Sequence, residues 1–194
     1  LRICKLASIS VFVTGGIGGV HRDVSESMDI SADLQEIKES TTITVCAGPK
    51  TILDIPKTYE ALETLSIPVF SYRQKNLPAF WYRDSGMGSA YRVESPEAIA
   101  NIFTIARATN SANGILLCNP IPKKFSIEQT YLEPLIASGV VELKKANITG
   151  KKLTPSLLRY LVQKTNGKTL HSNIELVKNN AILGARVAKA LSAA

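Results

Sequence analysis

Short runs of apolar, β-favouring residues alternate along the chain with longer segments whose apolar residues recur every three or four positions. The first pattern predicts strands at 11–14, 41–50, 68–72, 77–83 and 113–122. The second predicts helices near 1–10, 31–40, 58–67, 95–109, 126–138, 154–165 and 172–191, with Ser31 or Asp33 as the cap of the second. This alternation favours an α/β fold: a three-layer α/β/α sandwich with a mainly parallel or mixed central sheet.

The length and composition favour a globular chain with one large core. The 194 residues are 45% hydrophobic, and we expect them to form a single domain, 1–194. Helical apolar spacing already begins at Leu1, which predicts that this domain is incomplete at its N-terminus. No apolar run approaches the ~18 residues of a membrane span, so we expect a soluble protein with no membrane partner.

Charge and cysteine content narrow the choice of ligand and compartment. The net charge is +7, but the basic residues are scattered and only 6% of residues are aromatic. A nucleic-acid surface needs a basic stripe with stacking aromatics, so the charge favours a small phosphorylated ligand and no nucleic acid. Cys4, Cys46 and Cys118 lack a CxxC spacing, which indicates reduced packing residues in a cytoplasmic protein rather than disulfides or a zinc site.

The segment "VFVTGGIGGVHR", residues 11–22, places four glycines directly after a predicted strand. Bare backbone of this kind brings N–H groups close to a bound anion. Three interpretations compete: a nucleotide-cofactor loop, a phosphate-substrate loop of another enzyme, and a tight turn with no ligand.

The cofactor interpretation fits poorly. Thr14, Gly15 and Gly19 match the TGxxxGxG loop of short-chain dehydrogenases, but His21 stands where the last glycine belongs. A YxxxK pattern occurs at 160–164, but two fixed residues often match by chance. The GxxxxGK[ST] phosphate loop is also absent from the sequence.

Three polar features are expected at the carboxyl ends of strands, where open α/β sheets bind ligands. They are the glycine loop 15–22, the cluster 29–33, and Lys50 after "VCAG". A carboxylate beside a hydroxyl holds a hard divalent ion, and a lysine among apolar strand ends acts as a nucleophile. The alternative is purely structural: Asp33 caps a helix, Lys50 is a solvated turn residue and Asp29 lies on the loop surface.

The chain resembles the pseudouridine-5'-phosphate glycosidases, also called indigoidine synthase A-like proteins. The resemblance rests on "VFVTGGIGGVHR", "DISADLQE", "TVCAGPKTILDI", "LPAFW", "NPIP" and "SNIELVKNNA", in the family's order. It covers essentially all 194 residues and the later two-thirds of a family member. The earlier segment of the family carries a general-acid glutamate and a substrate-binding lysine.

The resemblance implies reversible cleavage of the C–C bond between ribose 5-phosphate and uracil in pseudouridine 5'-phosphate. It makes Lys50 the nucleophile that forms an imine with C1', and it places Asn173 near the reacting sugar. Asp29 would bind a manganese ion (Mn2+), largely through water. The substrate-contacting residues would be Ser31, Ala32 and Asp33. Family members are homotrimers, and the same is expected here; whether a kinase domain is fused to the chain stays open.

The remaining polar residues receive no catalytic role. The glycine loop is expected to let the backbone pass close to metal, phosphate and sugar. Arg22 either contacts phosphate or forms a structural ion pair. His21 and Cys46 are expected to be packing residues.

Two other functions stay open. One is a non-catalytic or degenerate homologue that binds ribose phosphate, and the other is a different lysine-dependent phosphosugar lyase or aldolase. Because the family's general acid lies upstream, these residues alone are expected to bind ribose 5-phosphate weakly and to catalyse poorly or not at all.

Overall fold

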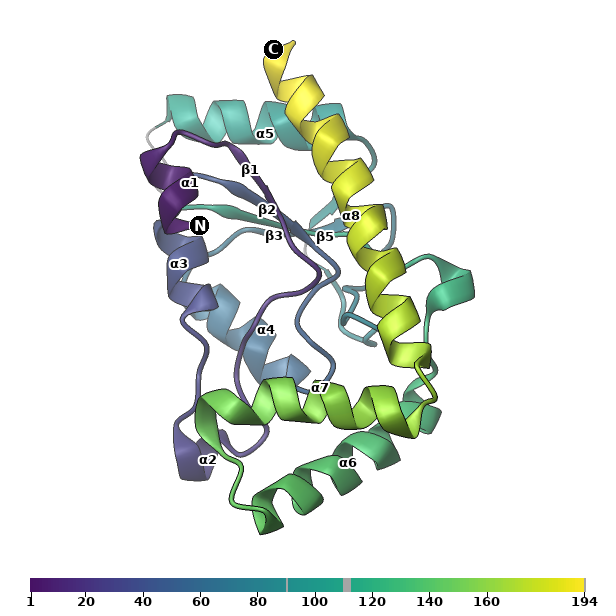
Figure 1. The fold of residues 1–194 in the computed structure, drawn as a ribbon. Coiled ribbons are helices and arrows are strands. Elements are labelled where there is room, and N and C mark those ends of the chain that lie inside the picture. The colour runs from purple at the N-terminus through teal and green to yellow at the C-terminus, as the bar shows by residue number, and fades with distance from the viewer. Residues whose placement is uncertain (90, 110–112, 194) are drawn as a thin grey trace.

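A parallel sheet forms the centre of the protein, as a computed structural model of residues 1–89, 91–109 and 113–193 shows (Figure 1). Its strands are β1 (Val11–Val13), β2 (Ile43–Cys46), β3 (Val69–Tyr72), β4 (Tyr91–Val93) and β5 (Ile115–Cys118). Their order is β1-β2-β5-β3-β4, and every neighbouring pair is parallel. The prediction of a mainly parallel central sheet is therefore confirmed.

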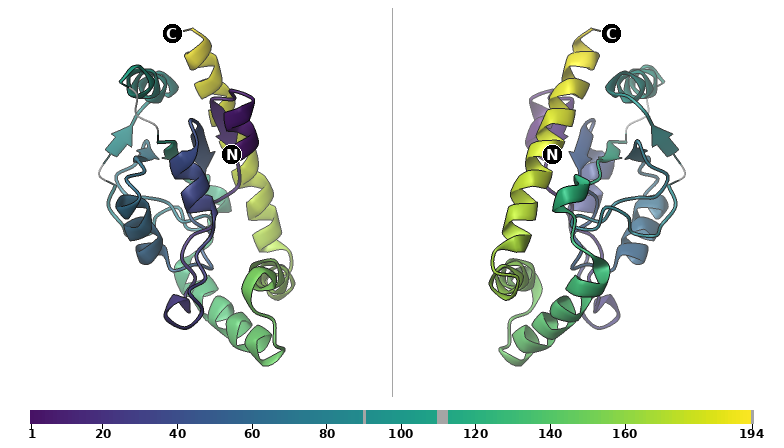
Figure 2. Two further views of the ribbon diagram at one scale, coloured as in Figure 1. Left: turned by 90° about the vertical axis from the view of Figure 1, so that its left-hand side faces the viewer. Right: turned by 90° about the vertical axis from the view of Figure 1, so that its right-hand side faces the viewer.

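Alternate residues of the central strands face two different helical layers. On β2, Ile43 and Val45 pack toward α5 (Pro96–Ala108) and α8 (Lys168–Ser192). Cys46 points the other way, toward α3 (Asp33–Glu39) and α4 (Ile55–Thr64). The same period-two alternation runs along β5, because successive strand residues face opposite sides. The result is the predicted three-layer sandwich, seen edge-on in Figure 2.

A third apolar cluster lies beyond the carboxyl ends of the strands. Helices α6 (Gln129–Lys145) and α7 (Leu153–Lys164) pack there against the first turns of α8 and against Trp81. Figure 1 shows α6 and α7 below the sheet, at the end toward which the strand carboxyl termini point. The short elements α1 (Arg2–Leu6), α2 (Val24–Ser27), η1 (Lys123–Phe125) and η2 (Gly150–Lys152) complete the described chain.

The expected strand at 77–83 is wrong. Ala79 and Tyr82 instead exchange backbone hydrogen bonds of 2.9 Å across a tight turn, with Phe80 at a φ of 56°. The segment is apolar because Ala79, Phe80 and Trp81 are buried in the third cluster, and burial of a loop leaves the same sequence pattern as a strand. The sequence pattern does not predict β4, because this strand is short and two of its three residues are exposed.

The helix expected near 95–109 is confirmed as α5, and Ser95 caps it, since its side chain accepts a hydrogen bond from Ala98 N. The cap expected at Ser31 or Asp33 is wrong: the N-cap of α3 is Ala32, and no side chain caps the helix. The Asp33 carboxylate is used elsewhere, in the candidate site.

Candidate functional site

The glycine loop after β1 and the turn after β2 run side by side. Ile17 pairs with Pro49 in a parallel bridge, Ile17 N donates to Gly48 O at 3.2 Å, and Lys50 N donates to Ile17 O at 3.0 Å. Lys50 is half-buried, and no described residue forms a salt bridge with its ammonium group. The structure therefore holds the backbone of Lys50 rigidly at the strand ends and leaves its amine unpaired by described residues.

The turn before Lys50 requires glycine at position 48. Gly48 has a φ of 88°, in the left-handed region that side chains disfavour. A Cβ on it would also overlap the carbonyl oxygen of Pro78. The 77–83 segment is thus in direct contact with the turn that carries Lys50.

The cluster 29–33 folds back onto the glycine loop. Asp33 Oδ2 accepts a 2.7 Å hydrogen bond from Gly18 N, and Ser31 Oγ accepts one of 3.2 Å from Asp33 N. Val20 and Ile30 form an antiparallel bridge beside them. A Cβ on Gly18 would overlap Ser31 Oγ. At this position the need for bare backbone is explained by protein neighbours. Hydrogen bonds hold Ser31 and Asp33 against the loop, and Ala32 lies between them in the chain.

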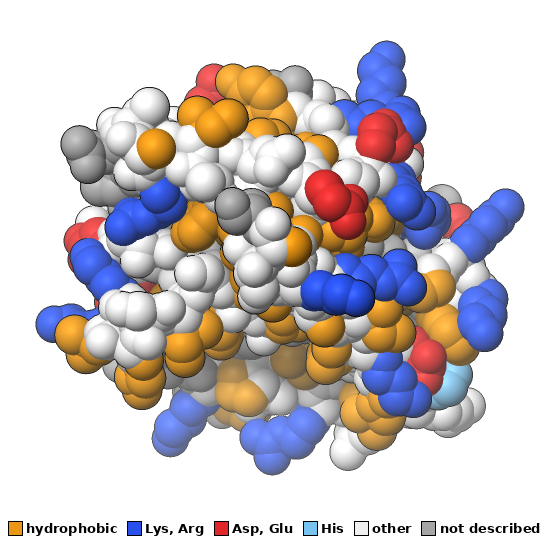
Figure 3. All heavy atoms as spheres, turned by 90° about the horizontal axis from the view of Figure 1, so that it is seen from above, with side chains coloured by type: hydrophobic (Ala, Val, Ile, Leu, Met, Phe, Trp, Pro, Cys, Tyr) orange, Lys and Arg blue, Asp and Glu red, His pale blue; other side chains and the backbone are white. Residues whose placement is uncertain are grey.

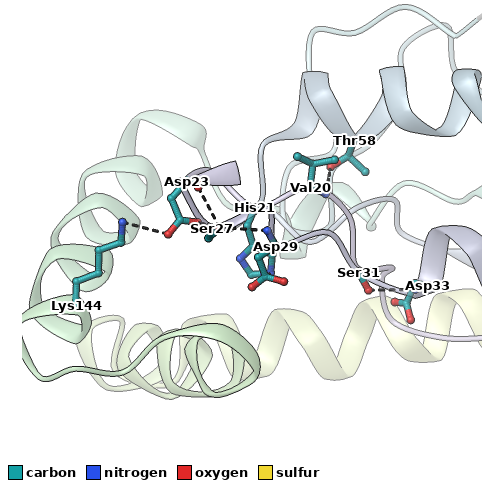
Figure 4. Close-up of polar contacts among 9 residues, drawn as sticks. All are labelled: Val20, His21, Asp23, Ser27, Asp29, Ser31, Asp33, Thr58 and Lys144. Atoms are coloured by element: carbon teal, nitrogen blue, oxygen red, sulfur yellow. Dashed lines mark hydrogen bonds and ion pairs between the residues drawn. The ribbon is translucent and has the colours of Figure 1, made fainter. Parts of the chain in front are cut away.

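Asp29 faces His21 across the base of the same hairpin (Figure 4). Asp29 Oδ2 lies 3.8 Å from His21 Nε2, and the two side chains are 32% and 13% exposed. His21 N donates to Asp29 O at 3.1 Å, so the hairpin backbone fixes the pair. Among the described residues, no group of three or more histidine, cysteine or acidic side chains is arranged to hold a metal. A metal here would have one protein carboxylate, beside His21, and would complete its shell with water or substrate oxygens, which suits a hard ion.

Asn173 lies on the second turn of α8 and is bonded to the 77–83 segment. Its Oδ1 accepts a 2.9 Å hydrogen bond from the indole Nε1 of Trp81. Because Gly48 contacts the same segment, Asn173 and Lys50 are connected through it. The chain thus joins two predicted catalytic residues that are far apart in sequence.

Sequence reasoning missed a buried pair of asparagines that ties α8 to the strand ends. Asn180 is fully buried, and its Nδ2 donates to Thr14 O at 2.9 Å and to Gly15 O at 3.2 Å. Asn119, directly after β5, donates to Asn180 Oδ1 at 3.1 Å. Both residues lie within motifs that carry the family resemblance, "NPIP" and "SNIELVKNNA", where a polar residue adjoins apolar positions.

Arg22 forms a structural ion pair. Its guanidinium makes two bonds to Glu133 of α6, at 2.7 and 3.0 Å, and donates to Thr51 O and Ile52 O at 2.9 and 3.1 Å. Tyr82 also donates to Glu133, at 3.0 Å. Of the two interpretations left open for Arg22, the structure supports the ion pair. The bonds of Arg22 to Thr51 and Ile52 attach this pair to the chain directly after Lys50.

A cavity of about 300 Å³ opens between α2 and helices α6 and α7, with His21 and Asp23 on its wall. Lys144 bonds Asp23 at 3.1 Å there (Figure 4). Partial burial acts to raise the pKa of Asp23, but the hydrogen bond and charge of Lys144 outweigh it and hold this pKa below its ordinary value. Asp23 is therefore ionised at neutral pH and is no proton donor.

Two alternative sets of reactive residues have packing roles. Cys46 and Cys118 are paired neighbours on β2 and β5, fully buried and unlinked. Hydrogen bonding to Cys46 and burial raise the pKa of the Cys118 thiol well above its ordinary value, so it is unreactive. Tyr160 of the YxxxK pattern packs against Gly139 of α6, and Lys164 lies over its ring at 5.3 Å.

Comparison with known proteins identifies the family. Residues 1–190 match the model of the family described as indigoidine synthase A-like protein. The chain belongs to the indigoidine synthase A-like family. Every site residue named above lies within the matched range, including the glycine loop, the 29–33 cluster and Lys50.

Relatives within this family carry a more specific name. The chain is 48% identical over 191 residues to the pseudouridine-5'-phosphate glycosidase of Staphylococcus aureus, covering 98% of this chain and 62% of that protein. It is 49% identical over 188 residues to the protein of the same name from Methylobacterium nodulans, covering 97% and 56%. The chain thus spans less than two thirds of the length of these relatives.

Two solved structures have the same fold as this chain. The prealnumycin C-glycosynthase AlnA, in complex with ribulose 5-phosphate, superposes with a TM-score of 0.91 at 31% identity, covering 99% of this chain and 63% of that one. An indigoidine synthase A-like protein from Thermotoga maritima gives 0.89 at 34% identity, covering 99% and 62%.

Proposed function

We propose that the protein is a pseudouridine-5'-phosphate glycosidase that cleaves the C–C bond between ribose 5-phosphate and uracil reversibly. The observation that carries this proposal is the 48–49% identity over 97–98% of the chain to proteins of that name. Because the chain spans 56–62% of those proteins, the activity proposed is that of the full-length gene product.

The reaction needs an amine because a carbon leaving group departs poorly by simple protonation. An ordinary glycosidase uses one of two carboxylic acids to protonate the leaving oxygen. A C-glycoside has no oxygen in the bond that breaks, so this route is closed to it. In the proposed mechanism, the neutral amine of Lys50 attacks C1', the bond from C1' to the ring oxygen breaks, and the ring oxygen takes up the proton that the lysine nitrogen loses. The nitrogen lone pair then forms the imine as the C1'–C5 bond breaks, and its electron pair goes to C5 of uracil.

The remaining steps need proton donors and substrate contacts. Uracil C5 takes a proton from the general acid that the resemblance places in an earlier segment, and water hydrolyses the imine to release ribose 5-phosphate. Ser31 still has its hydroxyl hydrogen for a substrate oxygen, since its Oγ acts as the acceptor toward Asp33 N. Ser31, Ala32 and Asp33 are proposed to hold the substrate, and Asn173 to contact the sugar.

We assign the metal to Asp29, with Mn2+ favoured over Zn²⁺ because oxygen ligands predominate. When bound, such an ion would neutralise phosphate charge. Asp29→Ala is expected to weaken Mn2+ binding at least ~10-fold, measured by titration calorimetry and by the Mn2+ dependence of activity. Asp23→Asn, on the same loop but paired with Lys144, is the matched control and should leave Mn2+ affinity unchanged. Unchanged binding in Asp29→Ala would contradict the assignment and move the ion to Asp33.

We also propose that the protein is cytoplasmic and assembles as a homotrimer. The unlinked cysteines support a reducing compartment. Leu170, Ile174 and Val177 form an exposed apolar stripe on α8, the kind of surface that subunit contacts bury. Among the described residues, no helix has both the length and the apolar character needed to cross a membrane.

On the face drawn in Figure 3, lysine and arginine side chains lie scattered among apolar and acidic ones.

A second candidate function is the formation of a C–C bond to a phosphosugar in a different pathway. The observation that favours it is the likeness to a C-glycosynthase solved with ribulose 5-phosphate. The lower identity, 31% against 48–49%, ranks it second.

Uracil release from pseudouridine 5'-phosphate by the full-length gene product tests the proposed function. Robust, Mn2+-dependent release is expected, and residues 1–194 alone should be ~10²–10⁴-fold slower without a positioned general acid. No release by the full-length protein would contradict the proposal and favour the second candidate or a non-catalytic binder. Equal rates from the two chains would show that the acid lies within residues 1–194.

A further inference from the structure

The hydrogen bond between Trp81 and Asn173 fixes which end of the asparagine amide is presented to solvent or ligand. The indole N–H is a donor with no acceptor capacity, so the 2.9 Å contact requires the amide oxygen on its side. Trp81 is 1% exposed and has no room to turn away. The amide NH2 group must therefore point away from Trp81, and no described residue accepts a hydrogen bond from it.

The backbone of Trp81 is bonded at the same time to the turn that carries Lys50. Thr51, fully buried and next to Lys50, donates from Oγ1 to Ala79 O at 2.9 Å and accepts from Trp81 N at 3.2 Å. Phe80 N donates to Ala47 O at 2.7 Å. The main chain of Trp81 is thus bonded to Thr51, next to Lys50, and the side chain of Trp81 is bonded to Asn173.

We infer that Trp81 is a positioning residue that fixes Asn173 relative to Lys50 and turns its amide so that NH2 donates to the substrate. The ligand group that Asn173 recognises is then a hydrogen-bond acceptor, a sugar or carbonyl oxygen. This inference rests on the proposed function. It also explains why a tryptophan side chain with a polar atom is buried in an otherwise apolar cluster.

A double-mutant cycle in the full-length gene product tests this role. Trp81→Phe keeps an aromatic ring but removes the N–H, and it is expected to lower kcat/KM for pseudouridine 5'-phosphate about 10-fold, the effect of one oriented hydrogen bond. In an Asn173→Ala background the same change should cost less than about 2-fold, because the group it orients is gone. Tyr82→Phe removes the neighbouring bond to Glu133 instead and serves as the matched control, with kcat/KM unchanged.

The outcomes separate the two claims. An equal loss from Trp81→Phe in both backgrounds, or no loss in the wild-type background, would overturn the positioning role. A wild-type protein that releases no uracil would contradict the proposed function. In that case the indole ¹⁵N–¹H signal, assigned by its disappearance in Trp81→Phe, still tests the bond: it should shift in Asn173→Ala and stay in place in Tyr82→Phe. An unshifted signal in Asn173→Ala would overturn the inference.

Discussion

Lys50→Arg in the full-length gene product is expected to reduce uracil release by at least ~10³-fold while leaving the protein folded. Arginine keeps the positive charge, but its guanidinium stays protonated and cannot form an imine. The half-buried position of Lys50 at the strand ends tolerates a cation of similar size. The loss is therefore expected in kcat, with little change in binding of the phosphate group, as steady-state kinetics will measure.

A matched lysine separates loss of the nucleophile from loss of charge. Lys57 on α4 pairs with Asp54 on the surface at 2.8 Å, and Lys57→Arg preserves that pair. Its uracil release should stay within about 2-fold of the wild-type rate, because surface substitutions away from the site change little. Activity of Lys50→Arg at a tenth or more of the wild-type rate would contradict the assignment of the nucleophile.

Gly48→Ala is expected to lower the free energy of unfolding by about 3 kcal/mol or more, beyond a usual single substitution. The φ of 88° strains any side chain, and the added Cβ overlaps the Pro78 carbonyl, which is backbone and moves little. The turn must therefore shift, and Lys50 shifts with it. Urea unfolding followed by circular dichroism measures the loss.

Gly86→Ala is the control for the strain of a left-handed residue alone. Gly86 has a φ of 76°, but a Cβ added there would have no atom within 4 Å. Only the backbone cost applies at this position, about 1 kcal/mol. Equal losses in the two variants would contradict the claim that contact with Pro78 makes glycine necessary at position 48.

The parts of the fold that the sequence predicted are short, largely apolar runs and helices with a clear start signal. Every residue of β2 and β5 is buried, which matches their apolar runs, and Ser95 and Pro96 mark the start of α5. The segment 77–83 is equally apolar, but its burial comes from packing under α6 and α7. A sequence pattern indicates burial, and it does not indicate whether the buried backbone is a strand or a turn.

Some contacts of the candidate site were also predictable from the sequence, and others were not. Lys50 follows β2, so its place at the strand ends was predicted from its position in the chain. The expectation that the 29–33 cluster follows a strand is wrong: the cluster follows α2 and reaches the glycine loop through hydrogen bonds of Ser31 and Asp33. The bond between Trp81 and Asn173 joins residues 92 positions apart, and that between Asn119 and Asn180 joins residues 61 apart. No local pattern predicts such pairings, because they depend on where α8 crosses the sheet.

The structure gives a different reason for the glycines of loop 15–22 than the sequence suggested. Its sequence suggested a cradle for an anion, but the N–H groups of Ile17, Gly18 and Val20 already donate to Gly48, Asp33 and Thr58. These bonds make the loop a rigid connection between the Lys50 turn and the 29–33 cluster. Contact of the loop with phosphate or metal stays a prediction.

The most direct test of Lys50 as an imine-forming nucleophile is reductive trapping. The full-length gene product is incubated with ribose 5-phosphate and borohydride, which reduces an imine to a stable secondary amine, and the modified peptide is mapped by mass spectrometry. We expect a ribose-phosphate adduct on Lys50 that is absent from Lys50→Arg. An adduct on another lysine that persists in Lys50→Arg, or no adduct under conditions where uracil is released, would contradict the assignment of Lys50.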